Sequence, residues 1–253
     1  MCTLAFAVRP SPGVLLAVTG NRNEFLARPA APPRIWPDMP GVLMPRDEKA
    51  GGTWLGLTAS ALFVCVTNRR GASPDPTRRS RGLLVLDALR CRDAAGVRAL
   101  CAALRPQQYN GFHLVFADAR EAGVAIGDGE RLEIRTLAAG EAHLVTERSY
   151  GAGEGVREVE VMREVGPLLL NPAVTASMLR PPMQRHGPSP LEGACVHADE
   201  FGYGTRSSIQ LVLRPSSPDF LWTQGAPCTN PSTDLSKAAA SLLGIIFAGG
   251  SPS

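Results

Sequence analysis

The chain has 253 residues, 44% of them hydrophobic and 19% charged, with a formal net charge of +3. A chain of this length buries about 70–75% of its unfolded surface, so it needs no covalent cross-links to stay folded. The small, scattered charge argues against a nucleic acid or a membrane surface as a partner. No repeat or change of composition marks an internal boundary, so we expect a single domain over residues 1–253.

The six cysteines include no CxxC pair, so the sequence predicts no zinc site, no redox motif and no other metal site. The chain does not open with a basic segment followed by a cleavable apolar one, so no secretory signal is expected. Reduced thiols in the cytoplasm are therefore predicted. The longest apolar stretch, AAASLLGIIFAGG, is too short to cross a bilayer and suits a buried helix.

The first predicted elements are two strands, at residues 3–8 and 13–19, joined by the turn sequence RPSPG. The Pro-rich segment that follows runs from RPAAPPRIWPDMPG to MPRDEKAGG. We expect it to be a long surface loop, because proline lacks the N–H group that helices and central strands use. Such a loop is a candidate wall of a binding site.

The rest of the chain separates into blocks of strands and blocks of helices. Strands are predicted at 53–58, 61–67, 111–118, 123–128, 131–137, 193–200, 207–214 and 219–224. Helices are predicted at 81–90, 93–104, after the glycines of 151–170, and at 233–248, with a break at 180–190. This segregation predicts an α+β protein in which layered antiparallel sheets are covered by helices.

Cys2 is the candidate nucleophile. If Met1 is removed, Cys2 carries both a thiol and a free α-amine, whose ordinary pKa of about 7.7–8.0 lets it take the thiol proton near neutral pH. One residue would then supply nucleophile and base for attack on an amide carbonyl, with a thioester as the product. If Met1 stays, the amine is acylated and this base is lost. A buried thiol that only fills space is the alternative, and it is the role expected of Cys65, Cys91, Cys101 and Cys195.

Three polar sets occur next to predicted strands, where side chains commonly line a cleft at the edge of a sheet. NRNEF (21–25) and TNRR (67–70) each follow a strand, and FGYGTRSS (201–208) precedes one. Each set also has an ordinary explanation, because Asn and Gly favour turns for local backbone reasons.

The order of these motifs resembles the NRDE family, which includes the transport and Golgi organisation protein two of animals. The resemblance rests on MCTLAF…LAVTGNRNEFLARP, RD…AGGTWLGL, TNRR, SRG, YNGFHLV and YGTRSS, and runs from Met1 to about residue 213. It implies an N-terminal-nucleophile (Ntn) hydrolase fold, a four-layer αββα sandwich with the second residue at the head of a central strand. Cysteine hydrolases of this fold that cleave penicillin V or bile-salt amides look like more distant relatives.

The resemblance also implies roles for individual residues. Cys2 takes the place of the nucleophile, and Arg22 would lie beside it and favour the thiolate. Asn68 would donate its side-chain N–H to the developing oxyanion, a contact typically worth about 2.7–4 kcal/mol in the transition state. Arg206 would close the site or bind a substrate carboxylate with two hydrogen bonds.

Two departures from the family pattern weaken the case for hydrolysis. The family motif has Asp where this chain has Asn23, which can accept a hydrogen bond from the α-ammonium but brings no charge. The family also tends to have LSN near the middle of the chain, where this sequence reads HLVTE at 143–147.

Trp36, Trp54 and Tyr203 are the candidates for contacts with a substrate. Trp36 lies in the Pro-rich segment and could line a pocket for an apolar ligand, whereas Trp54, inside GGTWLGL, equally suits core packing. Among the histidines, His113 and His197 fall in predicted strands and are expected to be structural. His186 falls in a Pro/Gly segment and is expected to be solvated.

Two functions remain open. The first is a cysteine amidohydrolase that cleaves a non-peptide C–N bond in a small, partly apolar substrate and needs no cofactor. The second is a carrier on the same scaffold that holds haem or another hydrophobic ligand, because animal members of the family are implicated in moving haem between compartments. The chain has no CxxCH haem-attachment motif, and the sequence names no iron ligand.

Overall fold

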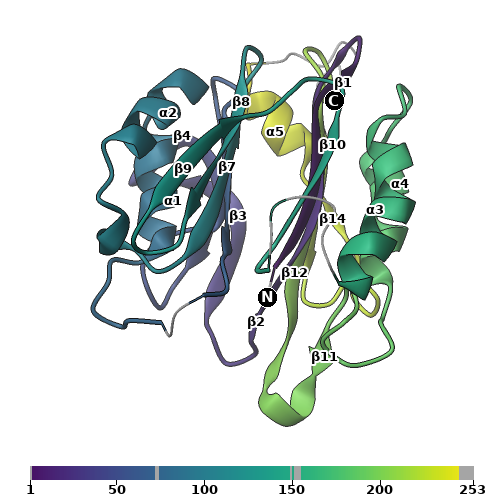
Figure 1. Ribbon diagram of the computed structural model, residues 1–253. Helices are drawn as coiled ribbons and strands as arrows, with labels where there is room; N and C mark the ends of the chain where they lie inside the picture. Colours follow the sequence, from purple (N-terminus) through teal and green to yellow (C-terminus); the bar gives the residue numbers. More distant parts are fainter. Residues whose placement is uncertain (1, 72–73, 149, 151–154, 245–253) are drawn as a thin grey trace.

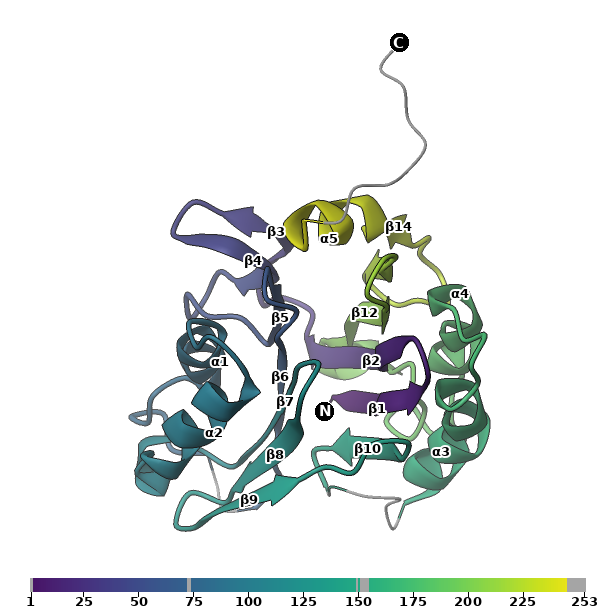
Figure 2. The ribbon, with the colours of Figure 1, turned by 90° about the horizontal axis from the view of Figure 1, so that it is seen from above.

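The computed structural model describes residues 2–71, 74–148, 150 and 155–244. Two antiparallel sheets lie face to face, and helices cover the outer face of each sheet (Figure 1, Figure 2). This arrangement is the four-layer αββα sandwich that the resemblance implied, so the predicted α+β class is confirmed. No helix in the described ranges is both long and apolar enough to span a bilayer.

The first sheet holds the N-terminal strand in its interior, between the edge strand and the second strand of the chain. Its strands run in the order β10-β1-β2-β12-β13-β14, and β11 pairs with β12. They are β1 (Thr3–Ser11), β2 (Val14–Phe25), β10 (Ala142–Thr146), β11 (His197–Ala198), β12 (Tyr203–Leu213), β13 (Asp219–Gln224) and β14 (Thr233–Asp234). The predicted hairpin of β1 and β2 is present, and its turn uses Gly13 at φ +81°, a conformation that favours glycine.

The second sheet follows the chain without a crossover, in the order β3 to β9. Its strands are β3 (Ala30–Trp36), β4 (Met39–Asp47), β5 (Leu55–Thr58), β6 (Phe63–Asn68), β7 (Phe112–Ala117), β8 (Ala122–Gly127) and β9 (Leu132–Thr136). Five of these strands, β5 to β9, lie within about two residues of the predicted bounds, and the apolar runs of β6, β7 and β8 end at Asn, Asp and Gly.

Helices α1 (Arg81–Leu89) and α2 (Ala94–Ala102) cover the second sheet, and α3 (Val156–Leu169) and α4 (Ala176–Leu179) cover the first. Both predicted N-termini on the second sheet are capped. The Ser80 hydroxyl accepts a hydrogen bond from the N–H of Gly82, and the Asp93 carboxylate accepts one from Gly96. Helix α5 (Ser236–Leu242) closes one side of the space between the sheets (Figure 2).

Three apolar cores separate the four layers. The core between the sheets packs Leu4, Phe6 and Val18 of the first sheet against Leu57 and Phe63 of the second. Burial of each such side chain stabilises the fold by about 1.5–3 kcal/mol. The other two cores lie between each sheet and its helices. The buried polar residues Asn21 and Arg22 of β2 and Ser207 of β12 lie next to the apolar core between the sheets.

The Pro-rich segment corrects the sequence prediction, because it forms the hairpin β3–β4 instead of a loop. β3 is the edge strand of its sheet, and its register shifts between Ala31 and Arg34, where Pro32 and Pro33 stand. An edge strand with an irregularity tolerates residues that lack an N–H donor. The other prolines of the hairpin, Pro40 and Pro45, lie in β4 on either side of Val42 and Leu43, the two residues that pair with β5.

Three further boundaries differ from the predictions. The set NRNEF lies inside β2, and YGTRSS lies inside β12, because these two strands pair along their whole length from Phe25–Tyr203 to Leu16–Leu213. The predicted strand at 193–200 shrinks to two residues, His197 and Ala198. The glycines at 151–154 and the end of the predicted C-terminal helix, 245–248, lie outside the described residues.

Candidate active site

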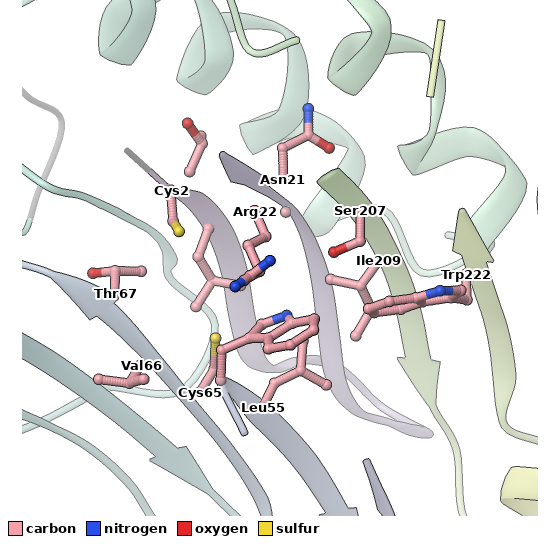
Figure 3. A pocket seen from close by; sticks show the side chains of 14 residues that line it. Cys2, Asn21, Arg22, Leu55, Cys65, Val66, Thr67, Ser207, Ile209 and Trp222 are labelled. Carbon is pink, nitrogen blue, oxygen red and sulfur yellow. The ribbon is translucent and has the colours of Figure 1, made fainter. Parts of the chain in front are cut away.

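A small cavity lies between the two sheets at the head of β1. Cys2, β1, β2, β12 and β13 form one side of it, and Trp54, β5 and β6 form the other. Figure 3 shows the side chains of Cys2 and Arg22 pointing into the same space, from neighbouring strands. The antiparallel pairing of β1 and β2, with Thr3 opposite Asn21, brings these two residues together.

The strand β2 distributes the NRNEF residues between two faces. Arg22 faces the cavity and its guanidinium lies 4.1 Å from the centre of the Trp54 ring. Asn21 points the other way, toward the helical layer, where its amide donates to the carbonyls of Met183 and Ala194, both at 2.8 Å (Figure 3). Successive side chains of a strand alternate in this way, so only one of the first two motif residues projects toward Cys2.

Arg22 is a buried cation beside the candidate nucleophile. Its side chain is 7% exposed, and the nearest carboxylate oxygen, on Glu24, is 3.6 Å from its Nη2 atom. Burial lowers the pKa of the Arg22 guanidinium, and negative charge on Cys2, Glu24 and Asp47 acts in the opposite direction. Its Nη1 atom is buried and meets no hydrogen-bond acceptor within the described ranges. This donor is available to a substrate oxygen or to a thiolate.

Ion pairs continue from Arg22 toward the surface. Glu24 lies 3.8 Å from Arg28, and Arg28 binds Asp47 with two hydrogen bonds of 3.1 and 2.5 Å. Burial raises the pKa of Asp47, but the hydrogen bond and charge of Arg28 outweigh it and hold that pKa below its ordinary value. Asp47 therefore stays ionised and keeps this chain of alternating charges in place.

Arg81 is a residue near Cys2 that the sequence analysis did not assign. It opens α1, and its guanidinium donates to the Gly111 carbonyl at 2.8 Å. Burial lowers the pKa of the Arg81 guanidinium, and negative charge on Cys2 acts in the opposite direction. The signal was present in the sequence as the motif SRG, which contributed to the resemblance but received no role.

Asn68 and Arg206 lie close to the cavity, but neither lines it. Asn68 is the exposed last residue of β6, directly after Thr67, which does line the cavity. Arg206 stands at the irregularity of β12, directly before the cavity residue Ser207, and donates to the carbonyl of Arg28 at 3.1 Å. This hydrogen bond ties Arg206 to the backbone of Arg28, the residue whose side chain pairs with Glu24 and Asp47.

Asn23 lies on the outer face of β2, with its side-chain oxygen accepting a 2.7 Å hydrogen bond from the Thr205 hydroxyl. Of the three candidate substrate contacts, only Trp54 lines the cavity, where its ring also lies 6.1 Å from that of Trp222. Trp36 is buried between the second sheet and its helices, with its indole N–H bound to Met44. The Tyr203 hydroxyl donates to the carbonyl of Asn23.

The cavity contains a second sulfur, on Cys65, which differs chemically from Cys2. Cys65 is fully enclosed in the core between the sheets, and burial raises the pKa of its thiol far above the ordinary range. Cys65 is therefore a neutral thiol, as predicted, whereas Cys2 is partly exposed. The enclosed space measures about 20 Å³, which is room for about one water molecule.

A family model described as Transport and Golgi organisation 2 matches residues 1–218. Among curated proteins, the chain is 32% identical over 126 residues to the human Transport and Golgi organization protein 2 homolog, and 30% identical over 125 residues to that of Mus musculus. Each match covers 47% of this chain and 45% of the relative, so the matched stretch spans about half the length of these relatives.

Solved Ntn hydrolases share the fold. The Caenorhabditis elegans ortholog of N-acylethanolamine-hydrolyzing acid amidase has a TM-score of 0.57 at 12% identity, over 83% of this chain and 92% of that one. A variant of the conjugated bile acid hydrolase of Clostridium perfringens has a TM-score of 0.56 at 11% identity, over 97% and 95% of the two chains. At this identity the likeness establishes the Ntn hydrolase fold and nothing finer.

Proposed function

Because the chain belongs to the Transport and Golgi organisation 2 family and has an Ntn hydrolase fold, we propose that it is a cysteine amidohydrolase with Cys2 as its nucleophile. One observation carries the proposal: Cys2 and the buried Arg22, which has an unused N–H donor, face one small cavity between the sheets. A buried cation beside a thiol favours the nucleophilic thiolate.

In the proposed reaction, Met1 is removed and the α-amine of Cys2 takes the thiol proton. The sulfur attacks the amide carbonyl carbon, and the carbonyl electrons move to oxygen to give an oxyanion. When this intermediate collapses, the C–N bond breaks and the α-ammonium returns the proton to the leaving amine. Water then attacks the thioester with the α-amine as base, which releases the carboxylic acid and restores the thiol.

Two groups are proposed to stabilise the oxyanion. The Nη1 atom of Arg22 has the free donor, and Asn68 follows the cavity residue Thr67 along β6. A donor aimed at the developing charge contributes about 2.7–4 kcal/mol. Because the Asn68 side chain is exposed, its contribution requires a substrate that extends out of the cavity.

The proposed substrate is a small amide with an apolar acyl part. Trp54, Trp222, Leu55 and Ile209 form apolar walls around the reacting sulfur. The cavity admits about one water-sized group, so a longer acyl chain requires these side chains to move apart. The names of the two structural neighbours refer to hydrolysis of N-acylethanolamines and of conjugated bile acids, which supports a small amphipathic amide as the substrate class.

The test begins with the intact mass of the purified chain, before and after brief exposure to iodoacetamide, and with mapping of the modified residue. We expect loss of Met1 and preferential labelling of Cys2. A panel of N-acyl amides is then screened for release of the free amine, with Cys2→Ala as the inactive variant. Cys91→Ser is the matched control, because Cys91 is a half-buried thiol beyond α1, away from the cavity. Retention of Met1, or labelling of Cys2 no faster than Cys91, would contradict the proposal.

The second candidate is a carrier for haem or another hydrophobic ligand. It is supported by an exposed apolar cluster at one end of β2 and β12, where Phe25 is 60% exposed, Leu26 37% and Phe201 65%. The N–H of Leu26 donates to the carbonyl of Gly202, so these exposed residues lie on two neighbouring segments. A haem titration that shifts the Soret band, and loses the shift in Phe25→Ser, would support a carrier, and no shift at micromolar haem would remove it.

A further inference from the structure

On the opposite side of β2 from the cavity, four potential metal ligands come together. His186, Cys195, His197 and Cys228 each offer one ligand atom, and these four atoms all lie within 4.8 Å of one another. Cys195 is buried, His197 and Cys228 are half-buried, and His186 is exposed. The sequence predicted no metal site because no CxxC pair was present, but these residues come from three separate segments.

The separations of three ligand atoms are close to those of a tetrahedral zinc site, with the His197–Cys228 separation the shortest. Zn–S bonds of about 2.3 Å and Zn–N bonds of about 2.0–2.1 Å place two sulfurs about 3.8 Å apart, and a sulfur and a nitrogen about 3.5 Å apart. The Sγ atoms of Cys195 and Cys228 are 3.5 Å apart. The Nε2 atom of His197 lies 3.6 Å from the first sulfur and 3.0 Å from the second. His186 completes the set, with its ring centre 5.0 Å from that of His197.

We propose that His186, Cys195, His197 and Cys228 bind one Zn²⁺ ion in a structural site. Two thiolates and two imidazoles in tetrahedral arrangement are the ligand set typical of zinc. Two thiolates and two neutral imidazoles also cancel the charge of the ion, which suits a half-buried position. With four protein ligands, no coordination position remains for water or substrate, so the role is to hold the chain together.

Hydrogen bonds hold the backbone on which the four ligands stand, as is needed for the ligand atoms to stay close together. The N–H of Cys195 donates to the carbonyl of Arg185 at 2.9 Å, which closes the loop that carries His186. Gly187 and Gly193 pack backbone against backbone inside that loop, where a Cβ atom on Gly187 would meet Glu192 at 2.5 Å. The turn of Cys228 is held by Arg180 and Gln184, which donate to the carbonyl of Pro227 at 2.9 and 2.8 Å.

The two asparagines of NRNEF connect this site to β2. Asn21 binds the carbonyl of Ala194, and Asn23 binds the Thr205 hydroxyl, which in turn accepts a hydrogen bond from the N–H of Val196. The residues on both sides of Cys195 are therefore held by the outer face of the strand whose inner face carries Arg22. Outer-shell hydrogen bonds of this kind commonly keep metal ligands in position.

The experiment measures the metal content of the full-length chain, expressed in zinc-supplemented medium and purified under reducing conditions without chelator or histidine tag. We expect about one zinc per chain by elemental mass spectrometry. Replacement by Co²⁺ should give the intense visible bands of a tetrahedral thiolate complex. The variant Cys228→Ser should bind zinc at least about 100-fold more weakly, because even outer-shell changes weaken sites by 10–100-fold.

Two further variants keep the proposal falsifiable. His186→Asn removes the exposed ligand with little effect on packing and should also weaken zinc binding, whereas Cys91→Ser should retain the full zinc content. The proposal is wrong if reduced wild-type chain takes up neither Zn²⁺ nor Co²⁺, or if both ligand variants retain zinc. It is also wrong if Cys195 and Cys228 are found as a disulfide, or if the site holds haem, with a Soret band that Cys228→Ser abolishes. Since the readout is metal content, a failed amidohydrolase assay would leave the zinc proposal unaffected.

Discussion

His113 makes the stability of the inter-sheet region sensitive to acid. It lies on β7, is 1% exposed, and its Nδ1 atom is 3.4 Å from the hydroxyl of Thr67, a residue of the cavity wall. Burial, together with the nearby positive charge of Arg69, lowers the pKa of His113 from 6.5 to about 4. The folded state therefore resists taking up a proton that the unfolded chain accepts.

The size and sign of the effect follow from the two pKa values. Above pH 6.5 both states are neutral at His113 and stability is unaffected, whereas between pH 6.5 and about 4 only the unfolded state binds the proton. Stability is thus lost as the pH falls through this window. From about pH 7 to about pH 5 the free energy of unfolding should fall by about 2 kcal/mol from this residue alone.

Urea unfolding, followed by tryptophan fluorescence and circular dichroism, measures this loss at both pH values in the wild type and in His113→Gln. Glutamine does not titrate and can still bond to Thr67, so the variant should lose about 2 kcal/mol less than the wild type on acidification. Other titrating groups are common to both proteins and cancel in the difference. Equal losses in the two proteins would refute the assignment of a buried, neutral His113.

Three further predictions concern buried polar side chains of the first sheet and of the helix that covers it. Arg22→Gln should slow alkylation of Cys2 by about 10-fold near neutral pH, because it removes the buried positive charge that faces the same cavity as the sulfur. Arg157→Met should destabilise the fold by about 3 kcal/mol, because Glu147 stays buried and loses the two hydrogen bonds of 2.7 and 2.9 Å from Arg157, keeping only Arg148 at 3.8 Å. Asn21→Ala should destabilise by at least about 2 kcal/mol, because it leaves two buried carbonyls unpaired, yet it should not change the rate of Cys2 alkylation.

Matched controls separate these effects from general damage. Arg135→Met removes an exposed ion pair with Glu133, and it should change stability by no more than about 1 kcal/mol in the thermal-unfolding assay used for Arg157→Met. An Arg157→Met protein as stable as this control would show that the buried pair contributes nothing. If Arg22→Gln alkylates as fast as wild type, Arg22 does not act on Cys2. If Asn21→Ala slows alkylation as much as Arg22→Gln does, the assignment of the two faces of β2 is wrong.

The order of strands and helices could be predicted from the sequence because most of them are bounded locally. The hairpin of β1 and β2 turns at a Pro–Gly pair, and the helices α1 and α2 begin at the side-chain caps Ser80 and Asp93. These are short-range signals, and they do not depend on distant residues. The hairpin β3–β4 was missed for the converse reason, since its prolines are accommodated by the edge position of β3 and by the short pairing of β4 with β5, and neither is visible locally.

The candidate residues were also visible in the sequence, and the resemblance placed Arg22 beside Cys2, but the faces on which the other residues lie were not visible. NRNEF reads as one motif, yet pairing of β2 with both β1 and β12 directs Arg22 toward Cys2, and Asn21 and Asn23 toward the helical layer. Trp36 and Trp54 flank the same Pro-rich segment of the sequence. In the fold, Trp36 packs between the second sheet and its helices, whereas Trp54 lines the cavity between the two sheets.

The sequence by itself therefore determined the element types, the layered α+β class and the chemical groups at hand, because periodicity, turns and caps act over a few residues. Only the tertiary structure decided which groups meet. Cys228 lies 33 positions from Cys195, and Cys2 lies 20 positions from Arg22. Contacts over such separations are set by strand register and by which face of a sheet each side chain occupies, and no local pattern encodes either.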